Sequence, residues 1–359
     1  MHYFGPWRDA DGALKKYLVQ KDDLHSGRKP RPEAEAVTVK DVANAFLNAK
    51  QALVDAGELS PRTWADYKQV SDLVVGQLGK ARLVGDVGPD DFAPLRDRMT
   101  KRWGPHRLNK RIQYTHSIFK FAFENGTIPT PVRFGPGFKR PSKKTIRLNR
   151  AGQGPQLFTA DEIHKLLGAA SVQVKAMILL GINCGFGNSD CAALPVSALD
   201  LKDGIVNFPR PKTGITRHCP LWPETIAALR AALEKRPTPK DEGDATRVFI
   251  TKYGDSWGTH PAAITHQTEK LMEKLGINGH RNFYTLRHTF RTVADAAKDQ
   301  PAADHIMGHE SSHMSSHYRE SIGDERLRAV TDHVHKWLFG DERKRNGEEL
   351  ATLRMNEEQ

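Results

Sequence analysis

The sequence predicts a mainly α-helical protein with a small β-sheet, built as two domains. Apolar residues recur at helical spacing through most of the chain, and strand signals are confined to one stretch, residues 199–221. The length of 359 residues exceeds what a single hydrophobic core usually supports. These observations favour an all-helical domain followed by a mixed α+β domain.

The first third of the chain contains only helix signals. Thr38 with Asp41 has the pattern of a capping box, and Ser60 followed by Pro61 is a second helix start. Apolar periodicity predicts helices at about 11–24, 38–57, from 61 onward, 89–100 and 106–124. We therefore expect an all-helical domain at 38–126, preceded by a polar segment at 1–36.

Residues 127–156 are predicted to be a linker without helix. Pro and Gly recur through the stretch, and it carries seven Lys or Arg residues but no acidic residue. A basic strap between two domains suits a protein that closes around duplex DNA, although it also fits an ordinary exposed linker. The residues in the strap that we expect to contact DNA are Lys139, Arg140, Lys143 and Lys144.

The second half mixes helices with short strands. Thr159 and Glu162 form a second capping-box pattern, and residues 172–187 predict a buried helix that ends in glycines. Turns at Asp203-Gly204 and at Lys212-Thr213-Gly214 predict strands on either side of them. Further helices are expected at about 223–235, 262–275, 284–298, 301–307 and 325–339, before a polar tail at 341–359 that is expected to fray or to bind a partner.

Charge is the first functional signal. The formal net charge is +11 and the pI is about 9.5, which favours polyanions because each neutralised phosphate releases condensed counterions. Basic residues crowd the start of the helix at 106–124, where a bound phosphate would offset their repulsion by the helix dipole. The alternative is a solvated basic face. The residues concerned are Lys101, Arg102, Arg107, Lys110 and Arg111.

Two classes of protein are disfavoured. No apolar run approaches the roughly 18 to 20 residues of a membrane span, and the N-terminus lacks an apolar signal core. Three cysteines cannot make a disulfide framework and fit a reducing cytoplasm, and their spacing is not that of a zinc ribbon. We expect a cytoplasmic, nucleoid-associated protein without membrane contact.

The stretch "GHESSHMSSHYRE", residues 308–320, has two interpretations. His309 to His313 has the form H-E-x-x-H, which on a helix binds zinc. The longer zinc-protease form fails, because Ser316 stands in place of its glycine and Arg319 in place of its third histidine. In the second interpretation, His309 is followed nine residues later by a tyrosine, Tyr318, that acts as a nucleophile. We predict no metal site.

The second interpretation is supported by a family resemblance. "YTLRHTF" at 284–290, "MGH" at 307–309 and Tyr318 resemble the C-terminal signature of the tyrosine recombinases, the phage integrase superfamily. The stretch "RPKTGITRHCPL" resembles the hairpin that carries the family's lysine, here Lys212. The resemblance covers roughly residues 38–338. It implies a two-domain clamp on double-stranded DNA, with a helical core-binding domain and a catalytic domain at 157–340.

The resemblance also implies the activity and its residues. Family members form a 3′-phosphotyrosyl bond with DNA and need no cofactor, and they act as tetramers on paired sites. Carried over, Tyr318 attacks, Arg287 grips the phosphate, Lys212 protonates the leaving oxygen, His309 assists, and Tyr284 stands where a histidine is usual. Residues 1–36 would belong to an arm-type DNA-binding unit or to a dimer-contacting unit. Trp337, Leu338 and Phe339 would dock on a neighbouring protomer or pack within the chain.

One departure puts the activity in doubt. In "CGFGNSDCAAL" the family's first arginine is replaced by Gly187, and Asp190 replaces a glutamate. Loss of one charged contact to a transition state typically costs about 3 to 4 kcal/mol. The chain is therefore expected to be a slow or rewired recombinase, or else a relative that occupies DNA without cutting it. Candidates to replace the missing group are Arg210, Arg217, Arg281, Arg291 and Asn188.

Overall fold

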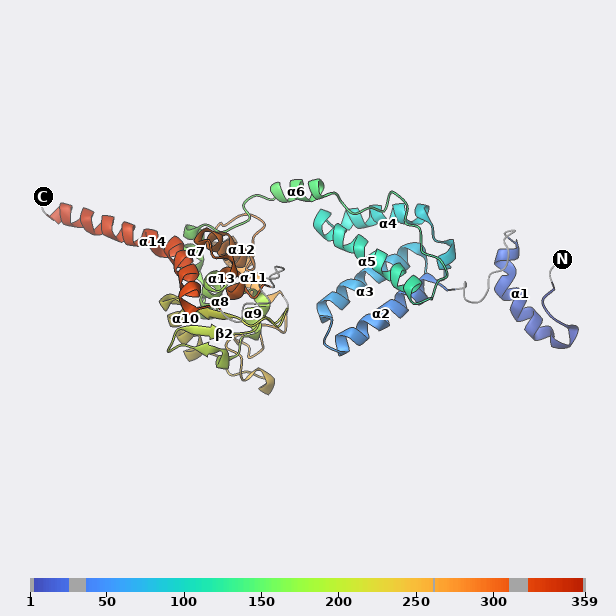
Figure 1. Cartoon of the computed structure of the whole chain (residues 1–359), viewed down its shortest axis with the longest axis horizontal. Helices are drawn as coiled ribbons and strands as arrows, with labels where there is room; N and C mark the ends of the chain where they lie inside the picture. Colours follow the sequence, from blue (N-terminus) through green and yellow to red (C-terminus); the bar gives the residue numbers. More distant parts are fainter. Residues whose placement is uncertain (1–2, 26–36, 261, 310–321, 358–359) are drawn as a thin grey trace. The chain divides into compact units, whose positions relative to one another are not determined.

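The computed structural model describes residues 3–25, 37–260, 262–309 and 322–357. It divides the chain into two compact units, Met1–Gly152 (unit 1) and Gln153–Gln359 (unit 2), which are drawn in Figure 1. Both are largely helical, and the strands lie in unit 2, as the sequence predicts. No helix in the described ranges is long and apolar enough to cross a membrane.

Four helices form the body of unit 1, and they begin where the sequence places their start signals. The Thr38 side chain accepts a hydrogen bond from the backbone of Asp41, whose carboxylate returns to Thr38 and completes the capping box. Ser60 caps the next helix, with Pro61 as its first residue. The helices are α2 (Val39–Asp55), α3 (Pro61–Leu78), α4 (Pro89–Arg102) and α5 (Pro105–Glu124). The predicted N-terminal helix is also present, as α1 (Ala10–His25) after η1 (Trp7–Asp9).

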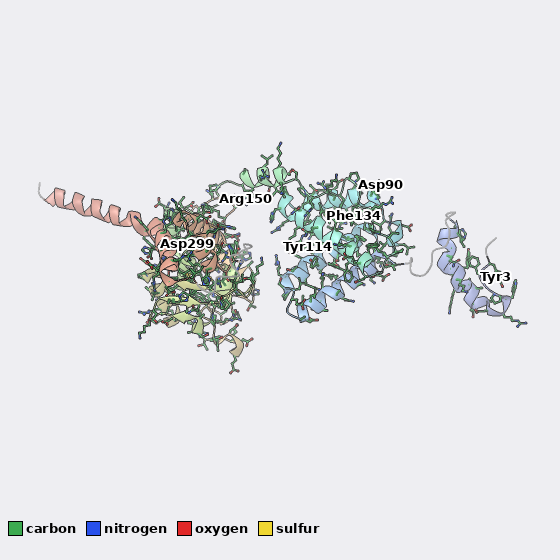
Figure 2. All side chains as sticks on the ribbon, in the orientation of Figure 1. Tyr3, Asp90, Tyr114, Phe134, Arg150 and Asp299 are labelled. Atoms are coloured by element: carbon green, nitrogen blue, oxygen red, sulfur yellow. The ribbon has the colours of Figure 1, made fainter. Side chains whose placement is uncertain are left out.

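Aromatic side chains fill the core of unit 1 and extend it beyond α5. Phe92 packs against Phe119 edge to face, and also against Phe134 and Phe138, which follow α5 in sequence. Phe134 and the core residue Tyr114 are labelled in Figure 2. Residues 128–138 therefore contribute to the core of the helical unit, although the sequence placed them in the linker. The signal was overlooked because Pro and Gly break helices but do not prevent burial.

The expectation that residues 127–156 contain no helix is wrong. Residues Lys143–Ala151 form α6. The Ser142 side chain caps its start by accepting a hydrogen bond from the backbone of Thr145, and the helix ends at Gly152. No Pro or Gly falls between these two positions, which is why a helix can form there. Lys139, Arg140, Lys143 and Lys144 are all exposed.

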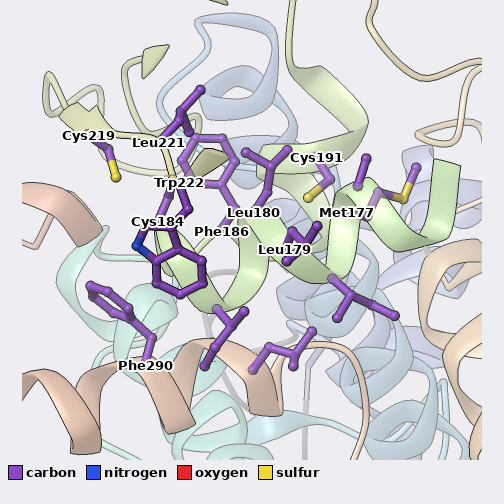
Figure 3. Close-up of a cluster of buried hydrophobic side chains, with 14 of the residues drawn as sticks. Met177, Leu179, Leu180, Cys184, Phe186, Cys191, Cys219, Leu221, Trp222 and Phe290 are labelled. Atoms are coloured by element: carbon purple, nitrogen blue, oxygen red, sulfur yellow. The ribbon is translucent and has the colours of Figure 1, made fainter. Parts of the chain in front are cut away.

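Unit 2 is built around the buried helix α8 (Val172–Asn183), whose core is shown in Figure 3. Packed near it are α7 (Ala160–Ala169), α10 (Pro223–Glu234), α11 (Ala263–Lys274) and α12 (Thr285–Ala294). The capping box at Thr159 and Glu162 is present. The unit also contains α9 (Asn188–Ala193), α13 (Gln300–Met307) and the short turns η4 (Val196–Ala198), η5 (Glu242–Asp244) and η6 (Asp295–Ala297).

The predicted strands form one antiparallel sheet in the order β1 (Leu199–Asp200), β2 (Ile205–Asn207), β3 (His218–Pro220). Val206 of β2 pairs with Cys219 of β3, and both side chains point into the core. Buried Asn183 joins α8 to the sheet: its amide donates to the carbonyl of Pro220 at 3.0 Å and accepts from the backbone of Trp222 at 2.9 Å. The β2–β3 hairpin is thereby fixed at its base.

The C-terminal helix differs from the expectation in two ways. It is α14 (Asp324–Glu357), which runs through the tail that was expected to fray; Glu, Leu, Ala, Lys and Arg in that tail are good helix formers. Leu338 is also buried within unit 2, with Trp337 and Phe339 packed against the same core. Of the two alternatives for these residues, the structure supports packing within the chain.

Candidate functional site

Three segments of unit 2 meet at one turn, Gly308-His309, which directly follows α13. Arg287 of α12 donates to the carbonyl of Met307 at 2.8 Å, and Arg210 of the β2–β3 hairpin donates to the carbonyl of Gly308 at 3.2 Å. Arg287 also binds the carbonyl of Gly185, just before α9. Gly308 has a φ of +61° and lies so close to the hairpin that a Cβ there would be 3.0 Å from the Cβ of Arg210.

Among the predicted site residues that the structure describes, Arg287 is the most deeply buried, with an exposed fraction of 2%. Burial, aided by the nearby charge of Arg210, lowers the pKa of Arg287 to about 10, so the guanidinium remains protonated at neutral pH. Two of its five N–H donors are used by the carbonyls of Gly185 and Met307. The remaining donors can bind an anion.

His309 lies beside Arg287 and Arg210 and is about one-third exposed (35%). Burial lowers the pKa of the His309 imidazole, and the charges of Arg287 and Arg210 lower it further, against the opposing effect of Asp304. Its Nδ1 is 3.5 Å from a carboxylate oxygen of Asp304. At neutral pH the imidazole is uncharged and can donate or accept a proton.

A pH effect on stability follows from the lowered pKa of His309. The unfolded chain takes up the proton near the ordinary value of 6.5 while the folded chain does not, so this group's contribution is lost as the pH falls below about 6.5. We expect urea unfolding at pH 7.5 and pH 5.5 to show a smaller difference in stability for His309→Gln than for the unchanged protein. Equal differences in both proteins would contradict the assignment.

The hairpin presents Lys212 at its tip. The carbonyl of Arg210 accepts hydrogen bonds from the backbones of Thr213 at 3.1 Å and Gly214 at 2.8 Å, and its N–H donates to Ile215. Gly214 has a φ of +70°, a conformation that favours glycine. This tight turn leaves Lys212 exposed to solvent, so its ammonium can reach a bound molecule.

Arg217 is buried beneath the same turn. Its guanidinium donates to Asp190 at 3.0 Å and to the carbonyl of Phe208 at 2.8 Å, and it lies 4.3 Å from the centre of the Phe186 ring. Burial lowers its pKa, which the Asp190 carboxylate opposes. The other carboxylate oxygen of Asp190 accepts from the backbone N–H of Gly187 at 2.6 Å. Arg217 and Asp190 thus form an internal ion pair at the start of α9.

Two positions that differ from the family's pattern, Gly187 and Tyr284, lie next to each other. The backbone of Gly187 has a φ of −100°, which any residue adopts. A Cβ at this position would lie 3.0 Å from both Cδ2 and Cε2 of Tyr284, however. The Tyr284 ring therefore packs where a side chain at 187 would begin. An arginine at 187 requires this ring to move.

The other candidates for replacing the missing arginine bind elsewhere. Arg281 is buried and forms two hydrogen bonds with Glu162, at 2.6 and 2.9 Å. Arg291 binds the carboxylates of Asp304, at 2.7 Å, and Asp295, at 3.0 Å. Asn188 donates to the Thr265 hydroxyl at 2.7 Å. Arg210 and Arg217 are the candidates that adjoin the Gly308 turn.

The basic residues around the start of α5 divide into two groups. Lys101, Arg102, Arg107 and Lys110 are exposed. Arg111 is buried, and its guanidinium binds Asp66 at 2.9 Å, while Lys110 lies 3.3 Å from the same carboxylate. Arg111 therefore holds α5 against α3, a role that its position in a basic run did not indicate. Contact of these residues with DNA stays a prediction.

Two expectations fall wholly or partly outside the described residues. Tyr318 lies in the range 310–321, which the structure does not describe, and so does His313 of the zinc interpretation. Within the described ranges, no group of three or more His, Cys, Asp or Glu residues could hold a metal ion.

Residues 156–323 match the model of the phage integrase family. This region is a phage integrase family domain. The family resemblance on which the sequence interpretation rests is thereby confirmed, and the integrase domain contains every site residue described above in unit 2. It includes the Gly308 turn, the hairpin with Lys212, and the sequence position of Tyr318.

Similar proteins agree with this identification. Tyrosine recombinase XerC of Pseudomonas fluorescens is 28% identical over 163 residues, which are 45% of this chain and 52% of that protein. The chain thus spans about half the length of this curated relative. A lambda integrase dimer bound to a COC′ core site has a similar fold, with a TM-score of 0.60 at 17% identity over 89% of each chain.

Two further solved structures share the fold. The Tn1549 transposon integrase in complex with a circular intermediate DNA gives a TM-score of 0.59 at 17% identity, covering 81% of this chain and 98% of that one. A lambda integrase tetramer bound to a Holliday junction gives 0.54 at 17% identity, covering 89% of this chain and 91% of that one. At this level of identity the likeness concerns the fold alone.

Proposed function

We propose that the chain is a site-specific tyrosine recombinase that cleaves and rejoins duplex DNA through a 3′-phosphotyrosyl intermediate at Tyr318. The observation that carries the proposal is the pair of positive side chains, Arg287 and Arg210, at the Gly308 turn of an integrase domain. The His309 imidazole lies beside them, next to the hairpin that bears Lys212. Such a group suits a phosphodiester, on which charge builds as phosphoryl transfer proceeds.

The roles follow from the chemistry of each side chain. The Tyr318 hydroxyl gives its proton to the His309 imidazole as its oxygen attacks phosphorus, the bond to the 5′-oxygen breaks, and that oxygen receives a proton from Lys212 to leave as a hydroxyl. Arg287 binds non-bridging oxygens through parallel N–H donors, which suits a buried guanidinium better than an ammonium. His309 and Tyr284 donate or accept at the same phosphate. Rejoining is the reverse, with a 5′-hydroxyl from another strand attacking the phosphotyrosine.

DNA and further copies of the chain are the proposed partners. The solved relatives named above are bound to DNA, as a dimer in one case and as a tetramer in another. We propose a tetramer on paired sites, held to the duplex by unit 1 and unit 2 together. The exposed residues Lys101, Arg102, Arg107, Lys139, Arg140, Lys143 and Lys144 would bind backbone phosphates. A DNA substrate places this activity at the nucleoid, in the cytoplasm.

The second candidate function is occupation of DNA without cutting. The observation that favours it is the packing of the Tyr284 ring 3.0 Å from the place where a Cβ at position 187 would lie, so that a side chain there would have to displace the ring. A site with one positive group fewer binds the DNA phosphate less tightly, and it also stabilises the transition state of cleavage less. The two functions differ in one observable: a covalent protein–DNA adduct.

The adduct is therefore the test. Supercoiled plasmid and short nicked duplexes are incubated with the protein and quenched with SDS, and relaxed topoisomers and a DNA-linked band are measured. We expect Tyr318→Phe to abolish the band, because the attacking oxygen is gone. Tyr253→Phe, which alters an exposed tyrosine with an accessibility of 65%, is expected to leave it unchanged. A salt-sensitive gel shift with no adduct from the unchanged protein would establish the second function instead.

A further inference from the structure

The cleavage site needs a second cation near Arg287, and Gly187 does not supply it. A phosphodiester presents two non-bridging oxygens that share its charge, and Arg287 already spends two donors on backbone carbonyls. The replacement must be positively charged, close to Arg287, accessible to DNA, and not already neutralised by a carboxylate. Arg217 and Arg210 are the two arginines near enough to be considered.

Arg217 fails the last of these requirements. The carboxylate of Asp190 already neutralises its charge at 3.0 Å. Its Nη1 has no hydrogen-bond partner among the residues that the structure describes, but the atom is buried among protein groups. Moving Arg217 to a phosphate would leave Asp190 charged and unpaired in the core, which is costly. Arg217 therefore stabilises the start of α9 through its ion pair with Asp190.

Within the part of the chain that the structure describes, Arg210 meets all four requirements. It is partly exposed, and among the residues that the structure describes no carboxylate forms an ion pair with it. Its charge is near enough to Arg287 and His309 to lower the pKa of each. Its one side-chain hydrogen bond in this part of the chain, to the carbonyl of Gly308, is long at 3.2 Å. A phosphate oxygen would be a stronger acceptor for the same N–H, since charge-assisted hydrogen bonds are about twice as strong as neutral ones.

We propose that Arg210 binds the scissile phosphate beside Arg287 and takes the part that Gly187 cannot play. The inference rests on the proposed function, because it concerns the same phosphate. The two guanidinium groups of Arg210 and Arg287 repel each other in the free protein. An anion bound between them attracts both, so their proximity favours phosphate binding.

The position of Arg210 also connects phosphate binding to the general acid. Its backbone closes the tight turn that carries Lys212, through hydrogen bonds to Thr213, Gly214 and Ile215. A phosphate held by the Arg210 side chain fixes the base of that turn. Lys212, two residues away, is thereby held near the leaving 5′-oxygen. Loss of Arg210 removes a charge and also loosens the lysine.

The test uses the full chain and compares Arg210→Ala and Arg210→Lys with a matched control, Arg230→Ala. Arg230 is an exposed arginine whose side chain donates to a single backbone carbonyl, Leu201, at the β1–β2 turn, whereas Arg210 lies past the opposite end of β2. The initial rate of adduct formation is measured at saturating DNA. We expect Arg210→Ala to lower the rate about 100-fold or more, Arg210→Lys to retain part of it, and Arg230→Ala to leave it unchanged.

A neutral linkage separates phosphate binding from a structural effect. Once the cleaved position is mapped from plasmid adducts, a duplex carrying a methylphosphonate at that position has one charge fewer to stabilise. The rate difference between Arg210→Ala and the unchanged protein is expected to shrink at least about tenfold on this substrate. A difference of the same size on both substrates would overturn the proposal, as would an Arg210→Ala rate equal to that of Arg230→Ala.

If the unchanged protein forms no adduct, the proposed cleavage is wrong. The phosphate contact of Arg210 can then still be tested through DNA binding. The affinity for duplex DNA is then measured as a function of salt concentration. Arg210→Ala is expected to reduce the slope by about one phosphate contact, and Arg230→Ala to leave it unchanged. Equal slopes for the two variants would show that Arg210 makes no phosphate contact.

Discussion

Replacing Arg287 by alanine is expected to lower the rate of DNA cleavage about 100- to 1000-fold, the usual cost of removing one charged contact to a transition state. The same change is expected to reduce the free energy of unfolding by about 2–5 kcal/mol. Arg287 is 2% exposed, and its removal leaves a cavity and strips the carbonyls of Gly185 and Met307 of their donor. Activity and stability must therefore be measured separately.

The cysteines provide a measurement of stability confined to unit 2. All three cysteines of the chain, Cys184, Cys191 and Cys219, lie there and are buried. Burial raises the pKa of the Cys184 and Cys191 thiols well above the usual range, so they react with an alkylating reagent only after the unit opens. The rate of alkylation, followed by intact mass, gives the change in the free energy of opening for each variant.

Arg281→Met is the matched control for Arg287→Ala. Arg281 is also buried, and it binds the carbonyl of Leu157 and the carboxylate of Glu162, away from the Gly308 turn. We expect Arg281→Met to speed alkylation by a similar amount while its folded fraction cleaves at the rate of the unchanged protein. If both variants lost cleavage in proportion to stability, Arg287 would be a structural residue only.

Much of the fold could be predicted from local sequence signals. The helix predictions were wrong where the rule that Pro and Gly break helices, or the search for apolar periodicity, did not apply. The capping boxes at Thr38 and Thr159 and the Ser60-Pro61 start were recognisable because each satisfies backbone N–H groups within four residues. The helix α6 was missed because prolines and glycines around it outweighed a nine-residue stretch that contains neither. The extent of α14 was missed because a polar helix offers no apolar periodicity to detect.

The site was predictable as far as spacing along the chain could show it. Motifs predict Arg287, His309 and Lys212 as site residues, and the structure adds that Arg287 and the turn bearing Lys212 adjoin one glycine turn. The contact between Gly187 and Tyr284 joins residues 97 positions apart in sequence, so no local pattern could reveal it. The same holds for the choice between Arg210 and Arg217, which depends on which guanidinium a carboxylate already neutralises.

Breaking the Arg217–Asp190 pair is expected to have the largest effect on stability. Arg217→Met leaves the Asp190 carboxylate 6% exposed and without its cation, and removal of one partner from a buried pair typically costs about 3–5 kcal/mol. Asp190 also accepts the N–H of Gly187 at 2.6 Å, so disturbance of this carboxylate loosens the start of α9. Cysteine alkylation should accelerate accordingly, with Cys191, the neighbour of Asp190, among the first thiols to react.

A double-mutant cycle shows whether the cost comes from the unpaired charge. Arg217→Met/Asp190→Asn removes both charges, and the amide can still accept from Gly187, so the double variant is expected to recover about 1–3 kcal/mol relative to Arg217→Met alone. Additive losses would mean that Arg217 stabilises the unit through its contact with the Phe186 ring and not through Asp190. A recovery of stability in the double variant would show that Asp190 neutralises the charge of Arg217 within the protein. In that case the phosphate must be bound by an arginine whose charge is free, as that of Arg210 is in the described part of the chain.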